Sequence, residues 1–309
     1  MITIRNRAAR TLLPGTVLTG SLLLMIPPLV ACNNEREHNP SQRSQVRTAS
    51  ETKYAFLVAG HVYGDPFGRT NKPYRPFVAS VKEINEEPNI KFGVLTGDLV
   101  HEPTTESWNA IDDLIEKFAF PIYIAAGNHD LKDRSLFERR YGKTYYTFRF
   151  EGDLFVVLDP NLDRWNITGQ QLQMLTTALW ELSEPTARVF LFFHQVLWYE
   201  PGGRFSYLQV NNLDTRSQSI NFWSDVVPIL TSIPNGVYCF AGDVGATKKS
   251  LGYYTGNYKN VKFVASGMGF GHSDNYLIVQ VKEDGQVVIR KVPLAQTGDT
   301  RETIGDRRS

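Results

Sequence analysis

Three buried strands early in the chain each end at a glycine or a polar residue, and helices separate them. The strands are predicted at Tyr54–Ala59, Phe92–Thr96 and Ile122–Ala126, and the helices at Pro73–Glu87 and Ser107–Phe118. Apolar and β-branched runs that do not alternate with polar residues are typical of strands covered on both faces. Strands that alternate with helices in this way predict an α/β fold whose sheet begins parallel.

The second half of the chain adds hairpins and further buried strands. Tyr199–Ser219 has no periodicity and is predicted to be a long loop, a kind of segment that is usually functional or disordered. The other predicted elements are a hairpin (145–150 and 154–158), helices at 168–182 and 222–230, strands at 188–193, 237–241 and 261–265, and a last hairpin (276–281 and 287–292).

The N-terminus has the pattern of a secretory signal. Arg5, Arg7 and Arg10 precede an apolar run over residues 11–30, which is the order of a positive region and a hydrophobic region in such signals. Leu29-Val30-Ala31-Cys32 resembles the bacterial lipobox, which implies cleavage before Cys32 and acylation of that cysteine. A plain signal peptide or an uncleaved anchor is the alternative.

This pattern predicts the domain boundaries and the location of the protein. Residues 1–31 would be the lipoprotein signal, and the polar residues 32–52 a disordered tether. Residues 53–294 would be the folded domain, and residues 295–309 a disordered tail. The lipid would hold the domain at a membrane in the cell envelope, outside the cytoplasm. Asn33 after the cysteine resembles lipoproteins sent to the outer membrane of Gram-negative bacteria.

The overall composition is that of an ordinary globular protein. With 33 Lys and Arg against 32 Asp and Glu among 309 residues, the formal net charge is +1. That balance provides no electrostatic basis for nucleic acid as a partner. Cys239 lies in an apolar run and is expected to pack in the core, since lipidation would occupy Cys32. The oligomeric state is not indicated.

Polar residues directly follow five of the predicted buried strands. They are His61, Asp98, the run Asn128-His129-Asp130, His194 and Asp243. One histidine after a strand is usually an ordinary surface residue, but five strand ends of this kind are harder to dismiss. Ligands of open α/β sheets bind at the carboxyl ends of the strands. Carboxylate, amide and imidazole groups at one edge of a sheet predict a site for a hard or borderline metal ion.

The order and spacing of these residues resemble the calcineurin-like metallophosphoesterase family, whose motifs each follow a strand. Gly97-Asp98 and Gly127-Asn128-His129-Asp130 match that pattern intact, and His194 stands where the family has a lone histidine. The resemblance covers about residues 54–292. It implies an α/β (α+β) fold with a two-sheet β-sandwich of mixed strands, flanked by helices, and a metal-dependent phosphoesterase that takes a phosphoester substrate.

The resemblance also implies roles for individual residues. Asp98, Asn128, His194 and Asp243 would hold one metal ion, and His61 together with Asp98 would remain for the other. His129 would act as the catalytic acid or the transition-state donor, with Asp130 orienting its ring.

Two positions depart from the family pattern. Ala59 replaces the first aspartate, and in Gly242-Asp243-Val244-Gly245 an aspartate and a glycine replace two histidines. The losses fall mainly on one of the two metal positions. Four residues in nearby loops are candidate replacement ligands, namely Asp65, His101, Glu102 and His272.

These departures leave two functions open. One is a lipid-anchored, extracytoplasmic hydrolase of phosphomonoesters or phosphodiesters. The other is a catalytically impaired protein of the same fold that acts in binding or assembly at the cell envelope. One or two divalent ions are expected. The oxygen-rich ligand set favours Mn²⁺, Mg²⁺ or Ca²⁺, and Fe and Zn²⁺ are the alternatives.

Overall fold

The computed structural model describes residues 51–63, 70–182, 184, 187–247, 250–269 and 271–295. The predicted signal peptide with Cys32, most of the tether, and nearly all of the predicted tail lie outside these residues. None of the helices in the described ranges has the length and apolarity that crossing a bilayer requires.

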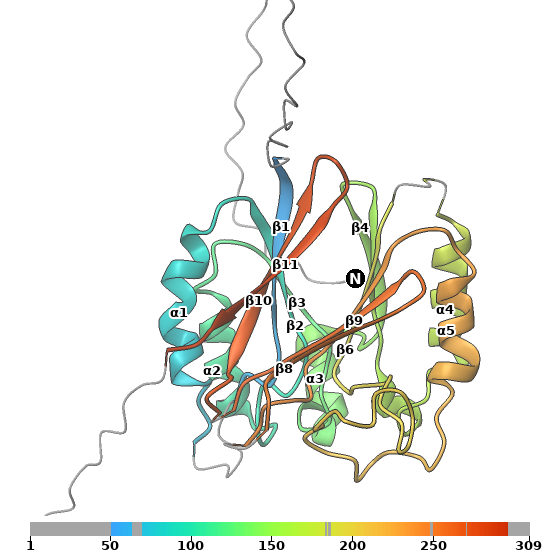
Figure 1. Cartoon of the computed structure of the whole chain (residues 1–309). Helices are drawn as coiled ribbons and strands as arrows, with labels where there is room; N and C mark the ends of the chain where they lie inside the picture. Colours follow the sequence, from blue (N-terminus) through green and yellow to red (C-terminus); the bar gives the residue numbers. More distant parts are fainter. Residues whose placement is uncertain are drawn as a thin grey trace, which may run out of the picture. The chain divides into compact units, whose positions relative to one another are not determined.

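Two mixed β-sheets form the centre of the fold (Figure 1). In the first sheet β1 runs parallel to β2, which runs parallel to β3. Strand β10 is antiparallel to both of its neighbours, β1 and β11. In the second sheet β5, β6, β7 and β9 are parallel, and the edge strands β4 and β8 are antiparallel. The first sheet has the order β11 (Val287–Pro293), β10 (Asn275–Lys282), β1 (Thr52–Ala59), β2 (Ile90–Leu95) and β3 (Ile122–Ile124). The second has the order β4 (Tyr146–Phe150), β5 (Asp153–Val157), β6 (Val189–Phe193), β7 (Val237–Ala241), β9 (Val261–Ser266) and β8 (Tyr253–Tyr258).

A layer of aromatic side chains joins the two sheets. Phe56 from β1 contacts the rings of Phe155, Phe190 and Phe240 from the second sheet, with centroids 5.1–6.3 Å apart. All four rings are fully buried. Burying large aromatic rings supplies much of the apolar area that stabilises such a core.

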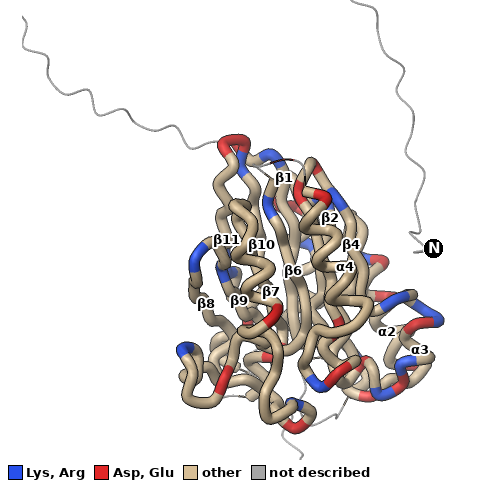
Figure 2. Tube along the Cα trace, turned by 90° about the vertical axis from the view of Figure 1, so that its right-hand side faces the viewer, with Lys and Arg blue, Asp and Glu red and all other residues tan. Residues whose placement is uncertain are grey.

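Helices cover the outer face of each sheet (Figure 1). On the first sheet lie α1 (Arg75–Glu86) and α2 (Thr105–Ile115), and α3 (Arg134–Tyr141) packs against α2 through contacts of Phe137 and Tyr141 with Trp108. On the second lie α4 (Gly169–Trp180) and α5 (Val227–Thr231). Helix α1 buries Phe77, Val81 and Ile84 at helical spacing, as its sequence predicts. Acidic and basic residues intermingle around α2 and α3 (Figure 2).

The two-sheet sandwich flanked by helices is confirmed, with local differences. The helix predicted at 222–230 is a π turn (Phe222–Val226) followed by α5. Helix α3 and strand β8 were not predicted. Two 3₁₀ turns, at Asp130–Asp133 and Pro160–Asp163, complete the described elements.

Candidate functional site

Four buried polar side chains meet where β1, β2, β6 and β7 end. They are His61, Asp98, His194 and Asp243, each exposing 2 % or less of its surface. Asp98 Oδ2 lies 3.8 Å from His61 Nε2 and 3.3 Å from His194 Nε2. His194 Nε2 in turn lies 3.7 Å from Asp243 Oδ1. Four of the five predicted ligands therefore form one chain of contacts, and we call these four residues the buried ligand set.

Glycines allow the strand ends to approach this closely. A Cβ on Gly127 would lie 2.2 Å from Asp98 Oδ1, and one on Gly242 would lie 2.0 Å from the carbonyl oxygen of Thr96. Gly97 adopts a left-handed backbone at φ +83°, and Asp98 follows at φ +54°. Left-handed backbone in a residue other than glycine costs energy and is concentrated at functional sites.

Backbone hydrogen bonds fix the orientation of His194. Its Nδ1 donates to the carbonyl oxygen of Thr96 at 2.9 Å, since a carbonyl can only accept. Nε2 is then the nitrogen that faces Asp98 and Asp243. Burial disfavours a charged imidazole, but these two carboxylates outweigh it and raise the pKa of His194 to about 10. Without a cation, a proton on His194 supplies the positive charge between them.

The other members of the set have shifted pKa values as well. Burial lowers the pKa of His61 to about 4. It raises the pKa of Asp243 to about 7, because the neutral acid is favoured away from water. Burial also disfavours the charged form of Asp98, yet its pKa lies below the usual range because of the neighbouring His194. Strongly perturbed groups gathered at one place are typical of functional sites.

The donor atoms fit a divalent cation. His194 Nε2 and Asp243 Oδ2 are buried, and neither has a hydrogen-bond partner in the part of the chain that the structure describes. Buried polar atoms are rarely left unpaired in folded proteins. An imidazole nitrogen and carboxylate oxygens that converge without partners are a metal-ligand combination. The half-buried Asn128 is adjacent in the chain to His129, whose backbone N–H donates to Asp98 Oδ1 at 3.1 Å.

His129 and Asp130 are held differently from what the family resemblance implies. His129 Nδ1 donates to the carbonyl oxygen of His101 at 2.8 Å. The carboxylate of Asp130 accepts from the backbone N–H groups of Leu99, Val100 and Gly127 instead of from the ring. The His101 carbonyl therefore orients the imidazole, and Asp130 ties together the turns that follow β2 and β3.

The long loop predicted at 199–219 supplies a residue that sequence reasoning missed. Asn211 donates its backbone N–H to the Asp243 carbonyl at 3.1 Å, and its Oδ1 accepts from Ala246 N at 2.9 Å. Its Nδ2 is buried, and like Asp243 Oδ2 it has no hydrogen-bond partner among the described residues. The Asn211 side chain also helps to stabilise the charged form of Asp243 and so lowers its pKa. The only signal in the sequence was the length of this irregular loop.

The positions that depart from the family motifs are packed against their surroundings. Ala59 is fully buried at the end of β1. Gly245 has φ +84°, and a Cβ there would lie 2.9 Å from Gly252 Cα. A side chain at position 245 would therefore be strained by its backbone and would collide with the segment that leads into β8.

Of the candidate replacement ligands that the structure describes, none joins the buried ligand set. His101 and Glu102 instead form a group with His129, in which the possible ligand atoms lie within 4.8 Å of one another. His272 is exposed. Asp65 lies outside the described residues.

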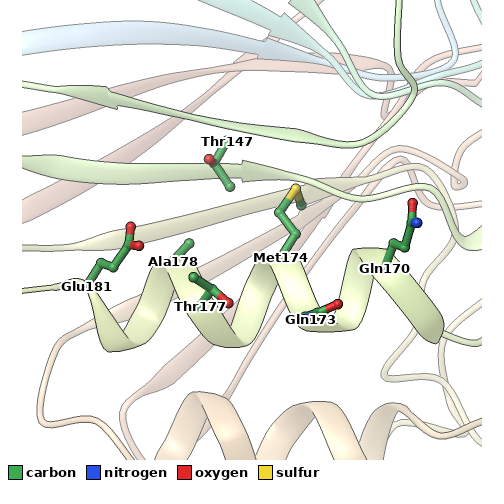
Figure 3. Close-up of a pocket in the computed structure, with 7 residues that line it drawn as sticks. All are labelled: Thr147, Gln170, Gln173, Met174, Thr177, Ala178 and Glu181. Carbon is green, nitrogen blue, oxygen red and sulfur yellow. The ribbon is translucent and has the colours of Figure 1, made fainter.

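A shallow groove lies elsewhere on the molecule, between β4 and α4 (Figure 3). Thr147 lines it from the strand, and Gln170, Gln173 and Thr177 line it from the helix. None of the residues at the strand ends borders this groove, so it is not part of the candidate site.

Comparisons with known proteins agree with this geometry. Residues 61–267 match the family model described as calcineurin-like phosphoesterase. Among solved structures, purple acid phosphatase PPD1 from yellow lupin (Lupinus luteus) superposes with a TM-score of 0.55 at 14% identity, covering 77% of this chain and 51% of the lupin chain. Vps29 from Chaetomium thermophilum matches with a TM-score of 0.33 at 11% identity, covering 79% and 97%. No curated protein matches this chain. The chain thus spans about half the length of the lupin phosphatase, and the likeness between the two is one of fold.

Proposed function

The chain belongs to the calcineurin-like phosphoesterase family, and we propose that it is a metal-dependent hydrolase of phosphomonoesters or phosphodiesters. The observation that carries the proposal is the pair of buried atoms His194 Nε2 and Asp243 Oδ2 beside Asp98, neither of which has a hydrogen-bond partner among the described residues. Leaving a buried polar atom without a hydrogen bond costs about 1–3 kcal/mol. The carboxylates of Asp98 and Asp243 carry negative charge, and neutral His194 offers a nitrogen donor, so a cation that replaces the proton of His194 satisfies all three groups.

Asp98, Asn128, His194 and Asp243 would hold one divalent cation, with His61 beside Asp98 at the other metal position. Mn²⁺, Mg²⁺ and Ca²⁺ suit the two carboxylates and one amide better than Zn²⁺ does. A bound cation would supply positive charge to the phosphoryl oxygens and lower the pKa of water.

His129 would act on the leaving group. Its Nδ1 is engaged by the His101 carbonyl, so Nε2 is the nitrogen that can donate to the departing oxygen. Its backbone is fixed to Asp98, which places the imidazole next to the cation ligands. Asp130 would contribute by holding the turns together, as a positioning residue.

The alternative function is binding or assembly at the cell envelope without efficient catalysis. The observation that favours it is that Ala59 and Gly245, which have no ligand atom in their side chains, stand where the family resemblance implies metal ligands. With one cation, a second charge contact to the phosphoryl group is missing, and each lost contact of that kind lowers the rate by roughly 10²–10³-fold.

Activity assays with matched variants test the proposal. The purified protein is supplied with Mn²⁺, Mg²⁺, Ca²⁺ or Zn²⁺ and assayed on phosphomonoester and phosphodiester model substrates. We expect His129→Ala to lower kcat by roughly 10²-fold with metal content unchanged, and Asp98→Asn to lower metal content and activity together. His272→Ala, at an exposed histidine, is the control. If wild type does not exceed the His129→Ala background with any ion, the binding function takes the place of the enzyme.

We also propose that the protein is anchored outside the cytoplasm through a lipid on Cys32. The support is the basic, apolar and lipobox-like order of residues 5–32, followed by a polar segment. In a bacterial host, wild type is expected in the membrane fraction and Cys32→Ser outside it. Membrane fractionation and processing that do not change in Cys32→Ser would contradict the anchor.

A further inference from the structure

A second group of potential ligands lies beside the buried ligand set. His101 and Glu102 follow β2, and His129 follows β3. Their possible ligand atoms all lie within 4.8 Å of one another. His101 Nδ1 is 3.6 Å from Glu102 Oε1, and the rings of His101 and His129 have centroids 5.0 Å apart. We call these three residues the histidine–glutamate cluster.

This cluster is open to solvent, in contrast to the buried ligand set. The side chains of His101 and Glu102 expose 24% and 52% of their surface. An ion from solution can therefore reach them. The ligands of a tetrahedral ion stand about 2.0–2.2 Å from it, so the present spacing requires only small shifts of side chains.

The chemistry of the cluster differs from that of the buried ligand set. Two imidazoles and one carboxylate are a donor set of the zinc type, with room for water at a fourth position. The buried ligand set with Asn128 has more oxygen donors and suits harder ions. The two groups would therefore select different cations.

The nitrogen of His129 that is left for an ion is the one that catalysis would use. Nδ1 donates to the carbonyl oxygen of His101. Nε2 alone can ligate, and Nε2 is also the atom assigned to the leaving oxygen. A cation held there and a hydrogen bond to the substrate exclude each other.

We propose that the histidine–glutamate cluster binds Zn²⁺ as a separate regulatory site, and that its occupation inhibits the enzyme by removing His129 from catalysis. The inhibition rests on the proposed function, whereas the binding does not. The cluster contains none of the buried ligand set, so it adds a cation without replacing the one held there.

Lys132 acts as a built-in competitor for the site. Its Nζ lies 2.5 Å from Glu102 Oε1 and donates to the carbonyl oxygen of His101 at 3.1 Å. The ammonium group thus neutralises the carboxylate that a zinc ion would need, and its hydrogen bond lowers the pKa of Glu102. Removing this charge should strengthen zinc binding, an effect that a purely structural cluster would not show.

Zinc binding to the manganese-loaded protein tests the proposal without using activity. Equilibrium dialysis with elemental analysis measures Zn²⁺ and Mn²⁺ on the same sample. We expect one Zn²⁺ to bind while Mn²⁺ is retained. Glu102→Gln should weaken zinc binding at least about tenfold, because loss of even a group that only supports a metal ligand lowers metal affinity about 10- to 100-fold. Glu106→Gln, at a nearby exposed carboxylate, should leave it unchanged. Zinc that only displaces manganese, or that binds Glu102→Gln as tightly as wild type, would overturn the site.

The lysine variant provides the converse measurement. Lys132→Gln should tighten zinc binding about two- to fivefold, since exposed ion pairs contribute about 0.2–1 kcal/mol. If Lys132→Gln binds zinc no more tightly than wild type, the competitor role is wrong.

Inhibition is measured separately on model phosphoesters with Mn²⁺ present. Wild type should lose activity as the site fills, and Glu102→Gln should need at least about tenfold more zinc for the same loss. Zinc that binds the cluster and leaves the rate unchanged would refute the regulatory role while leaving the binding site. A protein inactive with every ion would refute the proposed function, yet the dialysis result would still decide whether the site exists.

Discussion

The candidate site has two halves, and they differ in how closely their residues match the family motifs. The half at the ends of β2 and β3 contains the intact motifs around Asp98 and His129, and backbone N–H groups bind its carboxylates. The half at the ends of β1 and β7 contains His61 and Asp243, and has Ala59 and Gly245 where the family resemblance implies ligands. His61, Asp98 and Asp243 are buried, whereas Asn128 and His129 are half-buried. Both halves depend on glycines that admit no side chain. The half without these two ligands is therefore packed at least as closely as the half with the intact motifs.

The largest expected loss of stability comes from a substitution in the half with the intact motifs. Gly97→Ala would place a Cβ 2.6 Å from His194 Nδ1 and 2.7 Å from Gly127 N, at φ +83°. Overpacking and left-handed strain together should lower the free energy of unfolding by about 2–5 kcal/mol. Gly152→Ala has nearly the same backbone, at φ +87°, but has open space around it, and should cost only about 1–2 kcal/mol. Urea unfolding measures both, and equal losses would mean that the site glycine is not closely packed.

The second prediction concerns a metal ligand reintroduced at position 245, in the half at the ends of β1 and β7. Gly245→His reintroduces the residue that the family carries, yet its Cβ would lie 2.9 Å from Gly252 Cα. We expect a loss of about 2–4 kcal/mol in unfolding free energy and no additional bound metal. Gly142→His, at φ +86° with nothing within 4 Å, is the control for the backbone. A stable Gly245→His protein with a second tightly held ion would show that this half is still adaptable.

The third prediction concerns the cation that joins the two halves. Mn²⁺ at about 100 times its Kd should stabilise the native state by about 2.7 kcal/mol, if the ion binds the folded chain alone. That corresponds to a rise in Tm of about 5–10 °C for a domain of this size. Calorimetry with and without EDTA measures the shift. Asp98→Asn and Asp243→Asn should each remove most of it, and a shift that survives in one of them would assign the ion to a single half.

The smallest expected effect tests the loop that supports the altered half. Asn211→Ala removes the side chain that accepts from Ala246 N and that supports the charged form of Asp243. Metal affinity should fall about tenfold, since groups that orient a ligand typically contribute 10- to 100-fold. Asn212→Ala is the neighbouring control, because the Asn212 side chain bonds only Asp214 N among the described residues. Equal manganese affinities in the two variants, measured by titration calorimetry, would rule out the supporting role of Asn211.

Most of the fold could be predicted from the sequence because the buried strands are continuous apolar runs. Helix α3 was missed because it is rich in charge and buries only Phe137 among its eight residues. Strand β8 was missed because its residues alternate between half-buried and exposed and include Gly256 and Asn257, which disfavour strands.

Within the site, residue types were more predictable than their partners. The positions of His61, Asp98, His194 and Asp243 followed from the strand ends alone. The hydrogen bonds of Asp130 did not, because an acidic residue after a histidine can face either the ring or the backbone. Asn211 was also out of reach, since the bridge between Val210 and Val244 joins segments 34 residues apart.

The central strand of the first sheet has its two neighbours at very different distances along the chain. β1 pairs with β2 about 35 residues later, but its other edge pairs with β10, where Thr52 faces Lys282. During synthesis this edge stays unpaired until nearly the whole chain has emerged, and pairing over such separations is slow. An exposed strand edge is a template for association with other chains. A chain that lacks the hairpin of β10 and β11 would therefore expose the unpaired edge of β1 and aggregate. Every residue of the candidate site would still be present in that chain.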